Sequence, residues 1–336
     1  MKNIVLCFDR TDVEPGLRDA TNVRALFRLL DDTDGQIRWY DAGTATYGAR
    51  ARLPAVVREE VRETIAEAYE FLVDAWQPGD AIYIFGLGRG AYCARALTRL
   101  LGTVGVVDDR SDDVLDYAVD TYTLPRTMRS AQDWQQVRRL AAELVGQDEI
   151  AVPVRFLGLW DTVRAPGLPS LSSAEPLDNV VAGRHAVAID GSSSGELLWA
   201  SHIEQVWFRG AHCDVTGGPS ACWPLADIAL DWVLDGAVSA GIRLRDGFRC
   251  TAPAPSELYA LASNSHVLSR RKLPLGAPVH ASVEIYVRAH PQYWRRLPAR
   301  FEWADLDWLA RSERLAYAPT EPATRVERRT LTAAAS

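Results

Sequence analysis

The segment Ala81–Leu97 constrains the fold of this chain more than any other part of its sequence. It opens with a short apolar run, passes through the glycine-rich turn Gly86–Gly90, and continues with helical spacing. An apolar run bounded by a turn is typical of a strand that is buried on both faces. Glycines at such a turn permit positive φ angles and close approach of neighbouring backbone. The segment therefore predicts a strand, a sharp turn and a helix.

The same alternation continues along the chain and favours a doubly wound, mostly parallel α/β sheet with helical insertions. We expect strands at 4–8, 36–40, 81–85, 154–159, 205–208 and 279–287. We expect helices at 21–30, 55–76, 91–101, 112–121, 131–144 and 227–240. Residues 1–290 then form one domain, with an insertion or cap at about 105–150 and a long Pro-, Ser- and Gly-rich loop at 165–204. Residues 291–336 form a C-terminal extension whose end we expect to be disordered.

Composition narrows the function classes. The net charge of −7 over 336 residues gives no overall basic field, so we expect no nucleic-acid partner. No apolar stretch approaches the ~20 residues that cross a membrane, and no signal peptide is evident. The five cysteines form no Cys-x-x-Cys pair, which favours a reducing compartment. The sequence thus predicts a cytoplasmic protein acting on a small-molecule substrate, with no cofactor and no metal.

Four of the predicted strands end on residues that can carry chemistry. They are Asp9, the turn at Gly88, Asp161 and, just after its strand, His212. Ligands bind beyond the carboxyl ends of strands in open α/β sheets, so these residues are candidates for one site. The last three follow the chain order nucleophile turn, acid, histidine. In such a set the carboxylate orients the histidine and stabilises the imidazolium that forms when it takes a proton.

These segments resemble the bacterial α/β-hydrolase domain family that includes type VI secretion phospholipase effectors. The matching segments are Phe8–Thr11, Thr21–Val23, Tyr40–Gly43, Pro78–Leu97, Phe156–Val163, His185–Asp190 and Val206–Gly218. The resemblance covers roughly the first 290 residues and implies an α/β-hydrolase-like fold. It also implies a Ser-Asp-His triad whose second and third members are Asp161 and His212. The candidate oxyanion- or substrate-binding residues that it implies are Asp9, Arg10, Thr11 and Arg89.

Three positions depart from the family pattern. The nucleophile turn, Gly-Phe-Ser-Arg-Gly in the family, has Gly88 where the serine stands. The first loop has Arg10 in place of a glycine, and Thr216 also replaces a glycine. Because two of these changes fall on catalytic machinery, we expect a non-standard site. In it, His212 and Asp161 act as an acid–base pair in lyase, cyclase, isomerase or water-mediated hydrolytic chemistry.

Other interpretations stay open. The chain could be a pseudoenzyme with a binding role, or an esterase or phospholipase whose serine was deliberately removed. Gly86-x-Gly88-x-x-Ala91 with Asp108 and Asp109 downstream also fits a dinucleotide-binding fingerprint, which would make the chain an oxidoreductase.

Substitutes for the missing serine and a metal site are weaker alternatives. Cys93, Cys213 and the serines at 192–194 are possible replacement nucleophiles, although none has a favourable predicted position. A metal site built from His212, Cys213, Asp214 and Cys222 has no recognised ligand spacing.

Overall fold

A parallel β-sheet forms the centre of the molecule in the computed structural model. The structure describes residues 1–9, 20–43, 53–106, 119, 130–145, 150–164, 167–168, 177–192, 195–198, 200–218, 221–245 and 271–310. Within this part, eight strands form one sheet in the order β2-β1-β3-β4-β5-β6-β7-β8, and every neighbouring pair is parallel. The fold is therefore the α/β-hydrolase-like, doubly wound class that the sequence predicts.

The strands are β1 (Asn3–Phe8), β2 (Gln36–Asp41), β3 (Ala81–Leu87), β4 (Val154–Trp160), β5 (Gly183–Ala188), β6 (Ile203–Phe208), β7 (Ala277–His280) and β8 (Phe301–Ala304). The helices are α1 (Asn22–Leu29), α2 (Pro54–Ala75), α3 (Gly88–Thr103), α5 (Ala131–Val145), α6 (His212–Thr216), α7 (Trp223–Ser239), α8 (Ser282–Ala289) and the 3-10 helix η3 (Pro291–Arg296). The predicted helix at 112–121 lies outside the described residues, apart from Val119.

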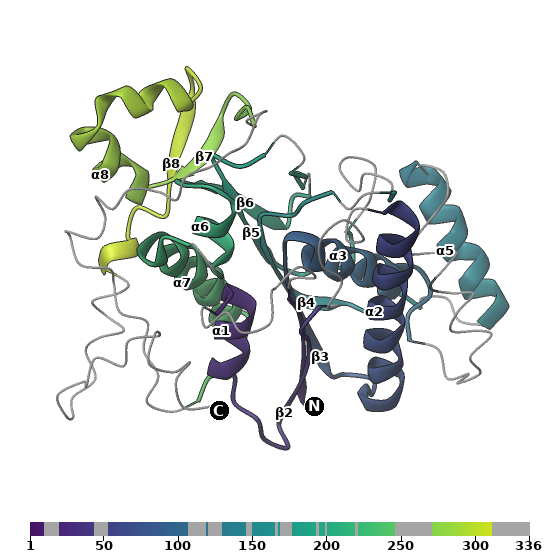
Figure 1. Cartoon of the computed structure of the whole chain (residues 1–336). Helices are drawn as coiled ribbons and strands as arrows, with labels where there is room; N and C mark the ends of the chain where they lie inside the picture. The colour runs from purple at the N-terminus through teal and green to yellow at the C-terminus, as the bar shows by residue number, and fades with distance from the viewer. Residues whose placement is uncertain are drawn as a thin grey trace.

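Helices cover both faces of the sheet. α2 and α3 pack on one face and α1 and α7 on the other, so the sheet separates two apolar cores (Figure 1). The central strands β1, β3 and β4 supply buried side chains to both cores, as continuous apolar runs predict. The strand order reverses at β1, which lies between β2 and β3. Such a switch point opens a crevice at the carboxyl ends of the strands, where ligands bind.

Two sequence predictions are wrong in this part of the fold. β5 runs through the middle of the segment 165–204, which we assigned to a long loop; its pairing with β4 and β6 makes it a central strand. Pro-, Ser- and Gly-rich flanks conceal this short run in the sequence. The predicted strand at 279–287 is instead the short strand β7 followed by helix α8. Within α8, Val283 and Val287 lie four residues apart and are buried in the same apolar cluster as Val279 of β7, which is the spacing of one helical face.

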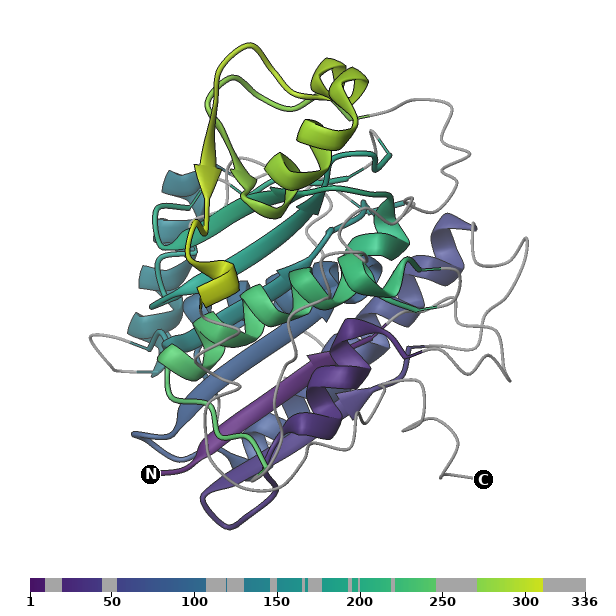
Figure 2. The ribbon, with the colours of Figure 1, turned by 90° about the vertical axis from the view of Figure 1, so that its left-hand side faces the viewer.

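The sheet continues beyond residue 290, where the sequence places the start of the extension. β8 pairs with β7, and η3 lies between α8 and β8 at the top of Figure 2. The Tyr293 hydroxyl donates to Asp190 Oδ2 at 2.6 Å, and Arg296 Nε donates to Asp190 Oδ1 at 2.9 Å. These bonds attach η3 to the segment that follows β5. The expected disordered end, beyond residue 310, lies outside the described residues.

None of the helices in the described ranges combines the length and the apolar character that crossing a bilayer requires.

Candidate active site

The turn between β3 and α3 is held tightly against the end of β1. A Cβ added to Gly90 would lie 2.4 Å from the Asp9 carbonyl oxygen, and one added to Gly86 would lie 2.6 Å from the Gly90 carbonyl oxygen. Both contacts are with backbone, so neither glycine can carry a side chain without moving the chain. Gly88, between them, is the first residue of α3 and has φ +54. The backbone therefore has the sharp strand-to-helix geometry of a nucleophile elbow.

Position 88 faces the imidazole of His212. A Cβ built on Gly88 would lie 3.3 Å from both Nε2 and Cε1 of His212, which are the nearest atoms among the described residues beyond its chain neighbours and the backbone of α3. A hydroxyl carried on that Cβ would come within hydrogen-bonding reach of the imidazole. Among the residues described here, Gly88 and His212 are thus related as a nucleophile position and a base.

His212 is hydrogen-bonded to Asp161. Its Nδ1 lies 2.8 Å from Asp161 Oδ2, and its side chain is 31% exposed while that of Asp161 is 1% exposed. His212 begins the short helix α6, which follows β6 after a tight turn at Gly210. Asp214 fixes this helix, because its carboxylate accepts from Ala211 N and Cys222 N, both at 2.8 Å. The structure brings Gly88, Asp161 and His212 together, as their chain order suggested.

The Asp161 carboxylate is fully engaged. Its Oδ1 accepts from Ala188 N at 2.9 Å and from Arg271 Nη1 at 2.7 Å, which leaves Oδ2 directed at His212. The residue has φ 41, an uncommon backbone conformation for a residue other than glycine. Burial opposes ionisation, but the Arg271 guanidinium and the His212 hydrogen bond hold the pKa of Asp161 well below its usual range. The carboxylate is therefore ionised and able to stabilise a protonated imidazole.

Arg271 and His185 complete the surroundings of this pair, and sequence reasoning missed both. Arg271 lies far along the chain from Asp161, and no motif marks it. His185 lies on β5, inside the segment we assigned to a loop; its Nε2 meets Thr162 and its Nδ1 meets Gln205. Burial lowers the pKa of His185 to about 3, so this histidine is neutral. Two signals in the sequence mark His185: it begins the family-matching segment His185–Asp190, and a short apolar run follows it.

Of the other predicted site residues, Asp9 and Arg89 lie in the described part of the chain. The Asp9 carboxylate is buried and accepts from the hydroxyls of Thr21, at 2.8 Å, and Tyr40, at 2.5 Å. Burial and Asp9 together raise the pKa of Tyr40. The guanidinium of Arg89 lies 3.8 Å from Glu60 on α2. Asp9 and the Arg89 side chain therefore have partners within the protein. Arg10 and Thr11, predicted near the oxyanion position, lie outside the described residues.

The alternative nucleophiles gain no support from the part of the chain that the structure describes. Cys93 is 1% exposed within α3, and burial raises the pKa of its thiol well above the usual range. Cys213 directly follows His212 in helix α6. The Ser192 carbonyl accepts from Arg271, and the serines at 193 and 194 lie outside the described residues.

The metal and dinucleotide alternatives gain no support from the described ranges. The proposed metal ligand Asp214 caps backbone amides with both oxygens, and no group of three or more metal-binding side chains occurs in the described ranges. Asp108 and Asp109, on which the dinucleotide alternative depends, lie outside them.

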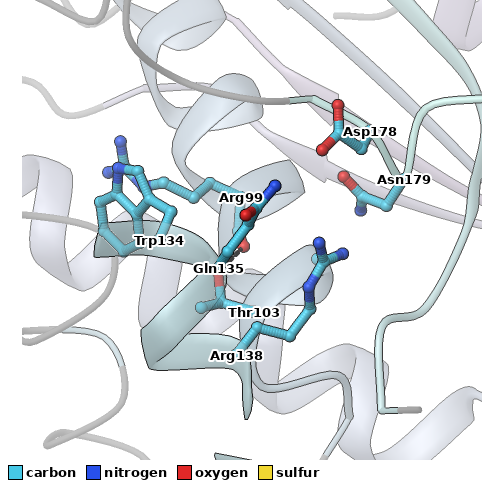
Figure 3. A pocket seen from close by; sticks show the side chains of 8 residues that line it. Arg99, Thr103, Trp134, Gln135, Arg138, Asp178 and Asn179 are labelled. Carbon is cyan, nitrogen blue, oxygen red and sulfur yellow. Dashed lines mark hydrogen bonds between the residues drawn. The ribbon is translucent and has the colours of Figure 1, made fainter. Parts of the chain in front are cut away.

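A crevice occurs at the opposite end of α3 from Gly88 (Figure 3). Its volume is only about 20 Å³, and Gly102 and Thr103, at the end of that helix, line it. The guanidinium of Arg99 stacks on the Trp134 ring at 4.9 Å instead of facing an open site. We therefore assign the crevice to the packing of α5 against α3 and place the candidate site at Gly88, Asp161 and His212.

Comparison with known families decides the relationship of this chain. Residues 2–236 of the 336 match the family model described as "T6SS, Phospholipase effector Tle1-like, catalytic domain". The chain belongs to this family. The matched range contains Gly88, Asp161 and His212 and ends before Arg271.

Individual proteins match this chain over only part of their length. The chain is 30% identical over 214 residues to the uncharacterized protein YEL023C of Saccharomyces cerevisiae, and the match spans 56% of this chain and 31% of that protein. The chain spans about a third of the length of this curated relative.

Two solved structures are also similar in part. An uncharacterized protein from Pseudomonas aeruginosa has 16% identity and a TM-score of 0.40, over 73% of this chain and 46% of that one. The Tle1 effector bound to the VgrG spike of the type 6 secretion system has 17% identity and a TM-score of 0.35, over 64% of this chain and 50% of that one. The chain therefore spans about half of each.

Proposed function

We propose that this protein is an ester hydrolase of the Tle1-like family in which water replaces the serine nucleophile. One observation carries the proposal: His212 Nε2 lies 3.3 Å from the point where a side chain at position 88 would begin. A water molecule in that space would take the place of a serine hydroxyl and would lie within reach of the same base.

The proposed reaction begins with His212. The unprotonated Nε2 removes a proton from the water while the oxygen of the water attacks the ester carbonyl carbon. Asp161 Oδ2 stabilises the imidazolium that forms. The tetrahedral intermediate collapses, the ester C–O bond breaks, and the imidazolium returns the proton to the leaving alkoxide. Water and ester are consumed, the acid and alcohol are released, and the enzyme returns to its starting state without a covalent intermediate.

The start of α3 supplies the position for the developing oxyanion. The amide N–H groups of the first helical turn have no partner inside the helix, and they direct a partial positive charge toward the turn. The backbone N–H of Arg89, directly after Gly88, is the first candidate donor. We assign the oxyanion role to this amide and not to the Arg89 side chain, which is directed to Glu60.

Family membership favours ester hydrolysis over the lyase, cyclase and isomerase chemistry that the sequence left open. The substrate class that we propose is a carboxylic ester, with phospholipids as the first candidates. The second candidate function is a binding protein without turnover, which the missing side chain at position 88 favours.

Hydrolysis with and without His212 separates the two functions. The wild-type protein, His212→Ala and His202→Ala should be assayed on short-chain nitrophenyl esters and on phospholipid vesicles. His202 is an exposed histidine outside the site and serves as the matched control. We expect turnover by the wild type and by His202→Ala, and a loss of at least about 10²-fold for His212→Ala. Ester binding without turnover by the wild type would support the binding protein instead.

A further inference from the structure

Arg271 is a buried charged group beside the site that the proposed chemistry has not used. Its side chain is 6% exposed, and it contacts three different parts of the protein. Nη1 donates to Asp161 Oδ1 at 2.7 Å, and Nε donates to the Ser192 carbonyl at 3.1 Å. Its backbone N–H donates to the Gly191 carbonyl at 3.1 Å. The guanidinium also lies 5.7 Å from the centre of the Trp207 ring.

The surrounding chain is shaped to admit this guanidinium. A Cβ built on Gly195 would lie 1.3 Å from Arg271 Nη2, so residue 195 must be glycine for the arginine to occupy its place. Gly195 itself is bridged to Val163, two residues after Asp161. A buried arginine, the glycine that makes room for it and the acidic residue of the site therefore form one packed unit.

We infer that Arg271 is a positioning residue for His212, acting through Asp161. Within the proposed function, on which this inference rests, Arg271 has two tasks. It keeps the carboxylate ionised in a fully buried position, and it occupies Oδ1 so that Oδ2 stays directed at His212 Nδ1. An aspartate buried beside an apolar core without such a partner would favour its neutral form.

The other charged and titratable groups around Asp161 cannot take over this task. His212 on α6 shares the opposite carboxylate oxygen, and its protonation changes during the proposed reaction. His185 on β5 is neutral. Arg95 on α3 pairs with Glu196 at 3.3 Å, and both of these side chains are buried. Arg271 is therefore the fixed positive charge that contacts Asp161 in the part of the chain that the structure describes.

Arg271 lies outside the range that matches the family. The matched range ends at residue 236, whereas Arg271 follows a separate segment and begins the run into β7. The segment 271–310 therefore supplies both the last two strands of the sheet and a group that acts on the acid–histidine pair.

The test is proton NMR of the His212 Nδ1–H, which needs no turnover. The downfield resonance of this proton, identified by its absence in His212→Ala, should be followed from pH 8 to pH 5 in the wild type and Arg271→Met. Lys272→Met is the matched control, because it removes the same charge from the adjacent, exposed residue. Gly195→Ala is the second variant: it displaces the guanidinium without removing any charge, and it keeps the inference testable where Arg271→Met does not fold.

We expect the wild type and Lys272→Met to keep the resonance over this range. In Arg271→Met and Gly195→Ala the resonance should move upfield or disappear within this range, because Asp161 then takes up a proton more readily. Arg271→Lys should restore part of the wild-type behaviour of the resonance. The same resonance and pH dependence in all these proteins would overturn the inference.

Kinetics give an independent readout of the same role. At pH 6, Arg271→Met should lower kcat by about 10- to 100-fold with little change in KM, because partners that orient a reacting group have effects of that size. An NMR result as expected together with an inactive wild type would contradict the proposed function alone. Hydrolysis with an unchanged NMR resonance would contradict the role of Arg271 alone.

Discussion

The two halves of the candidate site differ in what they retain. The acid–histidine half, at the ends of β4 and β6, keeps its side chains at hydrogen-bonding distance, and Asp161 joins His212 to Arg271. The elbow half, between β3 and α3, keeps the positive φ of Gly88 and the close backbone contacts of its outer glycines. What it lacks is a side chain. The backbone of the elbow and its nucleophile are therefore separable. Gly86 and Gly90 are required by close backbone contacts, whereas a Cβ at position 88 would meet only the His212 ring among the described residues beyond its own helix and chain neighbours.

The largest expected effect comes from reversing the hydrogen bond between Asp161 and His212 in the acid–histidine half. In Asp161→Asn, Arg271 and Ala188 N both donate at the Oδ1 position, so the amide oxygen must take that position. The amide NH₂ then faces His212 Nδ1, which must accept, and the proton moves to Nε2 where it prevents base catalysis. We expect a loss of up to about 10⁴-fold in kcat, measured by steady-state hydrolysis.

The same variant should also be less stable. Removing one charge of a buried pair costs about 3–5 kcal/mol because the remaining charge is left uncompensated. Urea unfolding of Asp161→Asn should show this loss, and a variant with full stability would mean that the Arg271 pair is not formed in solution.

Restoring a side chain to the elbow should give the next largest effect. Gly88→Ser places a hydroxyl beside His212, and we expect labelling by a fluorophosphonate at one site per protein. Gly88→Ala has the same backbone strain without the hydroxyl, and neither it nor the wild type should be labelled. Labelling of the wild type at any residue would contradict the idea that the elbow half is empty. Both substitutions should cost roughly 1–3 kcal/mol, because an L-residue at φ +54 is strained and its Cβ meets the imidazole at 3.3 Å.

The smallest effect concerns pH and the stability of the acid–histidine half. The pKa of Asp161 is lower in the folded protein than in the unfolded chain, so unfolding is accompanied by proton uptake at acidic pH. The resulting stabilisation is complete above about pH 4 and is lost as the pH falls further. The free energy of unfolding of the wild type should therefore decrease with acidification more steeply than that of Asp161→Asn, by at most about 1.4 kcal/mol per pH unit. Equal slopes in denaturant titrations between pH 5 and pH 2.5 would show that Asp161 is not preferentially ionised in the folded state.

Part of the fold and of the candidate site could be predicted from the sequence. Strands with continuous apolar runs, such as β1 and β3, are recognisable because burial on both faces needs apolar side chains throughout. The residues Gly88, Asp161 and His212 could be proposed because each lies at or just beyond the end of such a strand. The parallel sheet then brings these ends to one edge, which the structure shows.

Other features depend on contacts that no local pattern records. β5 is short and lies between flanks rich in turn-forming residues, so its central place in the sheet is evident only from its pairing. Arg271 is more than a hundred residues from Asp161, and its fit depends on a glycine at 195 that looks like any loop glycine. Helix α8 was mistaken for a strand because its apolar positions also fit a short alternating run.

The central claim is that His212 activates water directly and that no covalent acyl-enzyme forms. Rapid-quench kinetics with excess nitrophenyl ester over enzyme tests it most directly, with Gly88→Ser as the positive comparison. The account predicts linear release of alcohol from the first turnover in the wild type, and a burst of about one equivalent in Gly88→Ser if deacylation is slow. A burst in the wild type, or a wild type that hydrolyses no ester while Gly88→Ser does, would contradict the account.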